Sequence, residues 1–362
     1  MEPITRHSSY QQDLDNIKSL SNDLNIENFN FQLSYNKTIL SKEEIIGFLN
    51  NKQTTPKRYY YHKGMCPDLV LPESLKGVFD RSRSMFDIPQ MEVLTPLGKL
   101  CQPKTIDQLF YERARQIIDL AGSRKIVVAW SGGIDSTSVL VEFLKLAPKS
   151  QLTVLMNRYS IEEYPEFYAK YIKDQIEVID ISQPGILRNC VKDGIIVTGA
   201  TFDQTFGDET IHHPELSTTG LNKFLSHLNA STRECYAKSI EACPVKLTNV
   251  KEFFWWMYYT ICYQNYETVW LSIEDCLIAE QNIFHFPSNQ DWNDYSVSTP
   301  MDIKFPGYDY RNYKIALKNH IYEFNNDDYY RTYKVKFSSM VGILWQDRCH
   351  YITTDWQHGH AL

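Results

Sequence analysis

The chain has 362 residues, of which 43% are hydrophobic and 22% are charged, and its formal net charge at pH 7 is −7. These proportions indicate a globular protein with a sizeable core, and the acidic balance argues against nucleic acid as a partner. No uninterrupted apolar stretch approaches about 18 residues, so we expect neither a membrane-spanning helix nor a membrane partner.

Residues 1–104 are predicted to form an N-terminal region to which the sequence assigns no fold. This region is polar and rich in asparagine at first, with a helix start predicted at Ser41, and residues 54–103 contain several prolines. Its first residues lack the apolar segment of a secretory signal, so we predict a cytoplasmic protein. The eight cysteines of the chain include no Cys-x-x-Cys pair, which favours reduced thiols.

After residue 104, apolar periodicity predicts alternating helices and strands. A helix is expected at 105–120, before Gly122. The expected strands are 126–130, 152–156, 176–181 and 194–198, and helices are expected at 137–146, 162–172 and 186–192. Such alternation predicts an α/β fold with a parallel sheet and flanking helices. After Gly220 the sequence predicts a mainly helical extension, in which residues 251–270 form a buried aromatic helix.

A glycine- and hydroxyl-rich turn follows the first of these strands. It reads Ser131-Gly132-Gly133-Ile134-Asp135-Ser136-Thr137. The glycines allow a tight turn that brings backbone N–H groups close to an anion, and the hydroxyl groups add donors. The next helix directs its positive end at the same point, so we predict a phosphate cradle at the carboxyl end of the strand.

This turn resembles the signature of the ATP pyrophosphatase (PP-loop) superfamily, and neither Gly-x4-Gly-Lys-Ser/Thr nor a strand followed by Gly-x-Gly-x-x-Gly occurs. The resemblance implies an adenine nucleotide alpha hydrolase-like fold and cleavage of ATP between its α- and β-phosphates. It implies ATP and Mg²⁺ as cofactors, with Asp135 as a metal ligand. The implied ATP-binding residues are Ser131, Gly132, Gly133, Asp135, Ser136 and Thr137.

A second loop follows the fourth expected strand and contains Gly199, Asp203, Phe206 and Gly207. It is similar to the Gly-x-Gly-x-Asp-Glu-x-Phe-Gly loop of the asparagine synthetase-like synthetase domain. The resemblance implies that Asp203 binds the metal, together with Asp135 and the carbonyl oxygen of Gln204. The loop departs from the pattern at Ala200, Thr201, Gln204 and Glu209, which leaves open whether catalysis is retained.

A third segment, Arg331-Thr-Tyr-Lys334-Val-Lys336-Phe-Ser338, is similar to the late Arg-x-x-Lys-x-x-Phe-Ser loop of that family. The resemblance implies that Lys334, or its competitor Lys336, reaches the ATP phosphates and neutralises charge as pyrophosphate leaves. Residues 313–321 resemble the family's penultimate helix, and the whole resemblance covers about residues 105–342. The resemblance also implies that three aspartates, at 291, 294 and 302, are candidate substrate contacts, because this part of the family's helical domain borders the acceptor pocket.

Together these motifs predict an AMP-forming carbon–nitrogen ligase that adenylates the carboxylate or amide-type oxygen of a small-molecule acceptor. The first cysteine is Cys66 and residue 2 is Glu, so we expect no N-terminal glutaminase nucleophile. The nitrogen donor would be ammonia, an amine or a separate glutaminase. Three alternatives stay open: a PP-loop enzyme that modifies nucleobases or tRNA, a synthetase for a different small acid, and a nucleotide-binding module without catalysis.

Overall fold

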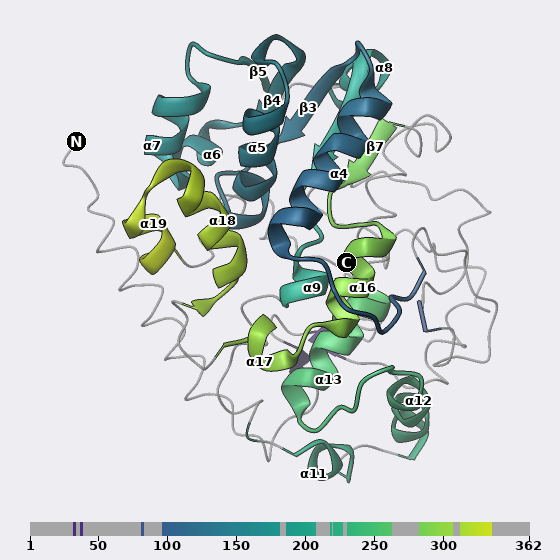
Figure 1. The fold of residues 1–362 in the computed structure, drawn as a ribbon. Helices are drawn as coiled ribbons and strands as arrows, with labels where there is room; N and C mark the ends of the chain where they lie inside the picture. Colours follow the sequence, from purple (N-terminus) through teal and green to yellow (C-terminus); the bar gives the residue numbers. More distant parts are fainter. Residues whose placement is uncertain are drawn as a thin grey trace.

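The computed structural model describes residues 32–33, 37–38, 81–82, 96–181, 186–207, 218, 220–226, 230–262, 282–306 and 312–334. Its centre is a five-stranded, all-parallel sheet in the order β5-β4-β3-β6-β7 (Figure 1). The strands are β3 (Lys125–Ala129), β4 (Leu152–Met156), β5 (Glu177–Asp180), β6 (Gly194–Thr198) and β7 (Ile283–His285). A separate two-stranded antiparallel pair joins β1 (Gln32–Leu33) to β2 (Lys37–Thr38). The predicted α/β architecture with a parallel sheet is confirmed.

The strand order reverses direction beside β3. From β3 the chain runs outward through β4 and β5, and it then returns to place β6 on the other side of β3. The register pairs Val128 with Val154 on one side and with Val197 on the other. At such a switch point the connections after the two central strands leave in opposite directions, which opens a crevice at their carboxyl ends. The segments after β3 and β6 are the two predicted motif loops.

Helices cover both faces of the sheet, as the continuous apolar strands predict. On one face, α4 (Ile106–Ala121) and α5 (Ile134–Leu146) pack over Ile126 and Val128, and α18 (Ile315–Asn325) packs against these two helices. On the other face, α8 (Ile186–Asp193) packs over Val127 and Ile196. Figure 1 shows α4 and α5 in front of the strands, with α18 beside them. The alternation of side chains along each strand thus divides the core into two layers.

Local sequence signals account for most helix ends. Thr105 caps α4 in a capping box with Gln108, and Gly122, at a φ of 59°, ends the helix. The predicted helix at 137–146 begins earlier, at Ile134, because Gly133 is already its N-cap. The predicted helix at 162–172 is divided into three parts, since Pro165 lacks the N–H that would continue the first one. These parts are α6 (Arg158–Glu163), α7 (Pro165–Phe167) and a π-helical turn (Tyr168–Ile172).

The C-terminal half is mainly helical, as predicted, but it also contains β7. This strand has three residues and pairs with β6, Phe284 lying opposite Val197. A strand so short shows no period in the sequence, so only its pairing reveals it. This strand is the fifth of the sheet and lies at one edge. The other described elements are η3 (Lys149–Gln151), α9 (Asp203–Phe206), α11 (Leu221–Ser226), α12 (Ala230–Glu241), α13 (Val250–Met257), a π-helical turn (Tyr258–Cys262), α16 (Gln290–Ser298), α17 (Met301–Lys304) and α19 (Asp328–Tyr333).

The predicted aromatic helix is buried where it is described, and residues 263–270 lie outside the described residues. Two lysines are buried with it. The Lys304 ammonium donates to the carbonyl oxygen of Ser296 at 2.6 Å and lies 3.5 Å from the ring centre of Trp255. Burial lowers the pKa of Lys304 well below its usual value, and burial lowers the pKa of Lys251 to about 8. Among the described helices, none combines the length and apolar character needed to cross a membrane.

The lowered pKa of Lys251 predicts a pH dependence of stability. Between the folded value of about 8 and the ordinary value of 10.5, the unfolded chain binds more protons, so the free energy of unfolding rises with pH. The Lys251→Met variant lacks this contribution. The wild type gains stability over this pH range and the variant does not. The free energy of unfolding of the variant minus that of the wild type should therefore decrease by on the order of 3 kcal/mol between pH 7 and pH 10.5. Urea unfolding at several pH values measures this difference.

The exposed Lys246 provides the matched control. A Lys246→Met variant should follow the wild-type pH dependence throughout. If the free energy of unfolding of Lys251→Met also changes with pH as that of the wild type does, the buried ammonium is not the source of the predicted destabilisation.

Candidate functional site

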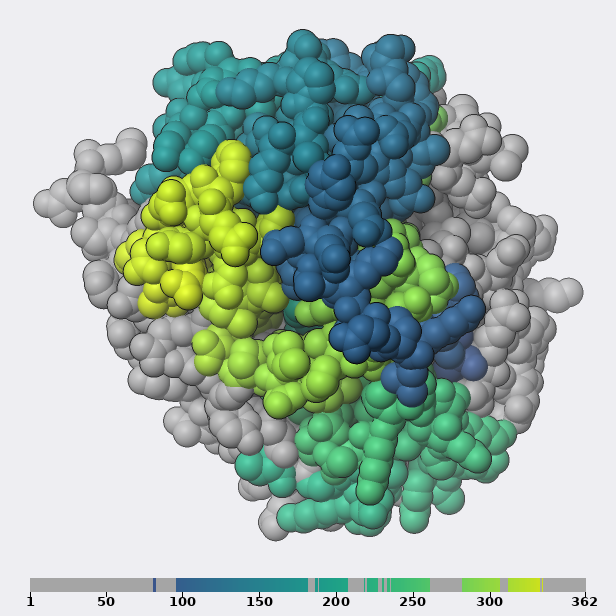
Figure 2. Space-filling view, in the orientation of Figure 1, coloured from purple at the N-terminus to yellow at the C-terminus, as the bar shows by residue number. Residues whose placement is uncertain are grey.

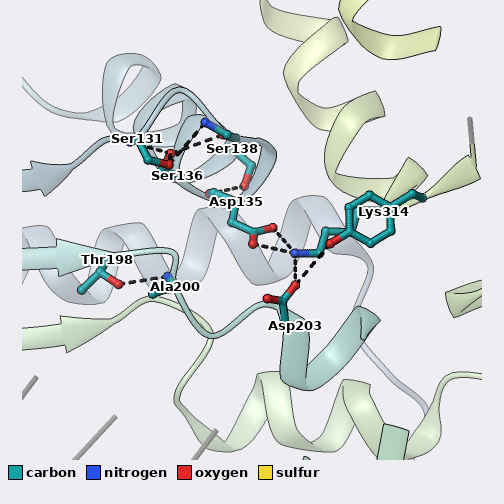
Figure 3. A network of polar contacts seen from close by, with 10 residues as sticks. Ser131, Asp135, Ser136, Ser138, Thr198, Ala200, Asp203 and Lys314 are labelled. Atoms are coloured by element: carbon teal, nitrogen blue, oxygen red, sulfur yellow. Dashed lines mark hydrogen bonds and ion pairs between the residues drawn. The ribbon is translucent and has the colours of Figure 1, made fainter. Parts of the chain in front are cut away.

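The turn between β3 and α5 is closed by its own hydroxyl groups (Figure 3). The N–H of Ser131 donates to Oγ of Ser136 at 3.0 Å, the two serine Oγ atoms are 3.0 Å apart, and the N–H of Gly133 donates to Oγ of Ser131 at 3.3 Å. Gly133 is the N-cap of α5 and has no side chain to accept the first-turn N–H groups. The turn therefore directs hydroxyl groups and the positive end of a helix at one point.

Gly132 is required by both its conformation and its surroundings. Its φ is 79°, in the left-handed region, and an added Cβ would lie 2.4 Å from the carbonyl oxygen of Ser160 and 2.7 Å from Cβ of Glu163. The turn thus packs directly against α6. A side chain at this position would push the turn away from the helix.

The backbone of the loop after β6 lies directly against the backbone at the start of α5. A Cβ on Gly199 would lie 2.6 Å from the carbonyl oxygen of Asp135, so only glycine lets the two segments approach this closely. The N–H of Ala200 donates to Oγ1 of Thr198 at 2.9 Å and turns the chain into α9. The adjacency of β3 and β6 therefore places Asp203, the first residue of α9, beside the first turn of α5.

A lysine lies between the two aspartates (Figure 3). The Lys314 ammonium is 2.6 and 2.5 Å from the two carboxylate oxygens of Asp135, and it also forms an ion pair with Asp203. The side chains of Lys314 and Asp203 are only 2% and 8% exposed, whereas that of Asp135 is 22% exposed. The hydroxyl group of Tyr313 donates to Oδ1 of Asp203 at 3.4 Å. One ammonium shared by two carboxylates leaves one negative charge, so the cluster attracts further positive charge.

Lys314 is one of the site residues that sequence reasoning missed, together with Glu163 and Tyr330 described below. The only sequence signal for Lys314 is its place in residues 313–321, the segment that resembles the family's penultimate helix. It precedes α18 in the left-handed conformation, with φ 48° and ψ 38°. This conformation costs a residue with a side chain about 1–2 kcal/mol, so the surrounding contacts must stabilise it.

Lys334 reaches the opposite side of the same turn. Its ammonium forms an ion pair with Glu163, whose side chain is 1% exposed and which adjoins Gly132. The hydroxyl group of Tyr330 donates to the carbonyl oxygen of Gly132 at 3.4 Å, and its ring stacks on Tyr164 with centroids 4.0 Å apart. Burial raises the pKa of Tyr330 well above its usual range, so it stays a neutral donor. Lys336 lies outside the described residues.

Two predicted site residues direct their side chains elsewhere. Thr137 is fully buried, and its Oγ1 accepts from the indole N–H of Trp130 at 3.0 Å. Gln204 is also buried, and its amide oxygen accepts from Nη2 of Arg81 at 3.2 Å while its amide N–H donates to the carbonyl oxygen of Pro287 at 3.4 Å. The structure therefore brings together Ser131, Gly132, Gly133, Asp135, Ser136 and Asp203. The side chains of Thr137 and Gln204 instead bond to Trp130 and to Arg81 and Pro287.

The three aspartates interpreted as substrate contacts lie apart from this cluster. Asp291 pairs with Lys104 at 3.0 Å, and Asp294 accepts from the N–H of Lys99 at 2.7 Å. Asp302 is exposed on α17. Two of the three thus bind the segment that precedes α4.

Comparison with known proteins adds no name to this site. A search with models of protein families found no match to this chain, and a search of the curated proteins found none either. Within the described part of the chain, no three or more His, Cys, Asp or Glu side chains cluster in a way that could hold a metal.

The close approach of the loops predicts the effect of a single methyl group. In Gly199→Ala, the added Cβ would meet the carbonyl oxygen of Asp135 at 2.6 Å, so the two loops must separate. We expect the free energy of unfolding to fall by about 1–3 kcal/mol, as measured by urea unfolding. In the control Gly220→Ala, the added Cβ meets no atom within 4 Å. Equal stability of the two variants would contradict the backbone contact.

Proposed function

We propose that this chain is an ATP-dependent synthetase of the PP-loop type, similar to the synthetase domain of asparagine synthetases. The observation that carries the proposal is the meeting of the Ser131–Ser136 turn with Asp203 at the switch point of a parallel sheet. In open α/β sheets, ligands bind in this crevice. A cytoplasmic protein that acts on small molecules is part of the same proposal.

The Ser131–Ser136 turn is suited to the phosphates of ATP. Backbone N–H groups at the start of α5 and the hydroxyl groups of Ser131 and Ser136 supply donors, and the helix adds a partial positive charge. The serine hydroxyls now bond to each other, so they would exchange this contact for phosphate oxygens. Thr137 would support the turn from within rather than bind ATP directly, since its hydroxyl lies in the core against Trp130.

Asp135 and Asp203 fit a magnesium ion. Their carboxylates already share one ammonium group, and Mg²⁺ is commonly held by one or two carboxylates together with phosphate oxygens. When bound, the ion would supply positive charge to the departing pyrophosphate. Gln204 is left out of the proposed ligand set, because its amide oxygen accepts from Arg81.

Two lysines border the phosphate site at opposite ends of the turn. Lys314 lies at its Asp135 end, and Lys334 lies at its Gly132 end beside Glu163. Both ammonium groups are paired with carboxylates in this structure. The negative charge of a bound nucleotide would draw them toward its phosphate oxygens. Each offers three donors to offset the negative charge that develops on the α-phosphate.

The proposed reaction has two displacements. An oxygen of the carboxylate or amide-type acceptor attacks the α-phosphorus, the bond from that phosphorus to the bridging oxygen breaks, and pyrophosphate leaves. Ammonia or an amine then attacks the activated acceptor carbon and releases AMP, and its surplus proton passes to solvent. The nitrogen would come from ammonia, an amine substrate or a separate glutaminase.

One observation favours a second candidate, a nucleotide-binding module without catalysis. Ala200 and Gln204 stand where the family pattern has acidic residues, and the amide of Gln204 is bound to Arg81 rather than to the aspartate pair. Such a module would bind ATP through the turn but would not transfer AMP to an acceptor.

The test supplies the protein with ATP, Mg²⁺ and a metabolite pool, and measures pyrophosphate, AMP and any new product by mass spectrometry. The Asp203→Asn variant should reduce pyrophosphate release by about 100-fold or more, because Mg²⁺ would lose one of its two carboxylate ligands and with it the positive charge that stabilises the departing pyrophosphate. Asp119→Asn is the control, since that exposed side chain lies on α4 and pairs with Arg115. It should release pyrophosphate at the wild-type rate.

Pyrophosphate release, measured beside thermal unfolding with and without MgATP, separates the two candidates. A synthetase is stabilised by MgATP and releases pyrophosphate, whereas a binding module is stabilised and releases none. A wild-type protein that is neither stabilised by MgATP nor releases pyrophosphate would contradict both.

A further inference from the structure

A segment before α4 lies against the elements that support α9. The N–H of Gly98 donates to the hydroxyl group of Tyr259 at 2.8 Å, and the N–H of Cys101 donates to Oγ of Ser298 at 2.9 Å. Gly98 is so close to α16 that an added Cβ would lie 2.0 Å from the carbonyl oxygen of Asn293. Figure 2 shows the blue atoms of this segment against the light green atoms of residues 282–306. This segment of the N-terminal region therefore contacts Tyr259 and α16, and the π-helical turn that contains Tyr259 packs, like α16, against α9.

Arg81, from the same region, reaches α9 itself. It is 3% exposed, its backbone N–H donates to the carbonyl oxygen of Thr260 at 2.9 Å, and its guanidinium carbon lies 4.4 Å from the ring centre of Tyr259. From this position Nη2 donates to the amide oxygen of Gln204 at 3.2 Å. The π-helical turn after α13 thus fixes the guanidinium, and the guanidinium binds Gln204.

Gln204 joins α9 to three other parts of the chain. Its side chain accepts from Arg81 and donates to the carbonyl oxygen of Pro287, just after β7, while its backbone carbonyl lies 3.5 Å from the donor Oγ of Ser296 on α16. The carbonyl oxygen of Phe286, next to Pro287, accepts from Arg113 on α4 at 3.0 Å. The hydrogen bonds of Gln204 therefore hold α9 against Arg81, the segment after β7 and α16.

Such external contacts matter because α9 has only four residues. An isolated helix of this length has too few hydrogen bonds to hold its own geometry. Asp203 is its first residue, directly before Gln204, and its carboxylate must stay beside Lys314 and Asp135. The orientation of that carboxylate consequently depends on what holds the next residue.

We infer that the N-terminal region supplies Arg81 as a positioning residue, which orients the Asp203 carboxylate by binding Gln204. Removal of the guanidinium leaves a buried amide oxygen without its donor, and a buried polar group without its partner favours rearrangement. The effect on MgATP rests on the proposed function, whereas the effect on α9 does not.

The first measurement is amide hydrogen exchange by mass spectrometry on the full chain. The amides of Phe206 and Gly207 donate to Phe202 and Asp203, so they report on α9. Arg81→Met should speed their exchange by about 10-fold or more relative to amides of α4. Arg81→Lys, which keeps one charged donor, should give an intermediate rate, and it decides the question if Arg81→Met does not fold.

Ser298→Ala provides the matched control, because it removes the hydroxyl that accepts from the N–H of Cys101 and leaves the contacts of Arg81 with Tyr259 and Gln204 in place. It should lower Tm without a selective change at Phe206 and Gly207. If Arg81→Met leaves exchange in α9 unchanged, or accelerates it equally in α4, the positioning role is refuted.

The second measurement is the dissociation constant of MgATP by calorimetry. Arg81→Met should weaken binding about 10-fold, Arg81→Lys less, and Ser298→Ala not at all. Equal affinity of Arg81→Met and the wild type would overturn the link to the nucleotide site. Absence of MgATP binding by the wild type would instead contradict the proposed function, and hydrogen exchange would still decide whether Arg81 positions α9.

Discussion

The close contact between Gly199 and the backbone of Asp135 is the constraint on which the candidate site depends. It joins the ends of β3 and β6, the two strands between which the sheet order reverses. Without a side chain on Gly199, the loop after β6 can approach the first turn of α5. Asp203, at the start of α9, lies only a few residues further along the chain. The position of the aspartate pair is therefore a result of backbone packing more than of side-chain contacts.

Charge within this packed region is balanced through ion pairs that a nucleotide could replace. Lys314 pairs with Asp135 and Asp203, and Lys334 pairs with Glu163 on the other side of the turn. Buried ion pairs gain little net free energy, because desolvation of both partners opposes their attraction. Phosphate oxygens and a metal ion could thus take over these partners at modest cost.

Much of the α/β core could be predicted from local patterns. The strands at 152–156 and 194–198 end where predicted, because continuous apolar runs bounded by turn residues mark them clearly. The helix over 105–120 was similarly marked by Thr105 and Gly122. Prediction was wrong where a local rule was overlooked, as at Pro165, or where no local rule exists, as in the three-residue β7. A strand of that length is defined by its partner strand.

The sequence by itself determined the composition of the first loop, since the glycines, hydroxyls and helix start of the predicted phosphate cradle are neighbours along the chain. It also marked Asp203, through the spacing of Gly199 and Gly207. Only the tertiary structure decided what these residues meet. Lys314 lies 179 positions from Asp135, and Arg81 lies 123 positions from Gln204. Neither contact has a local signal, because an ion pair or hydrogen bond between distant segments depends on the packing of whole helices and strands.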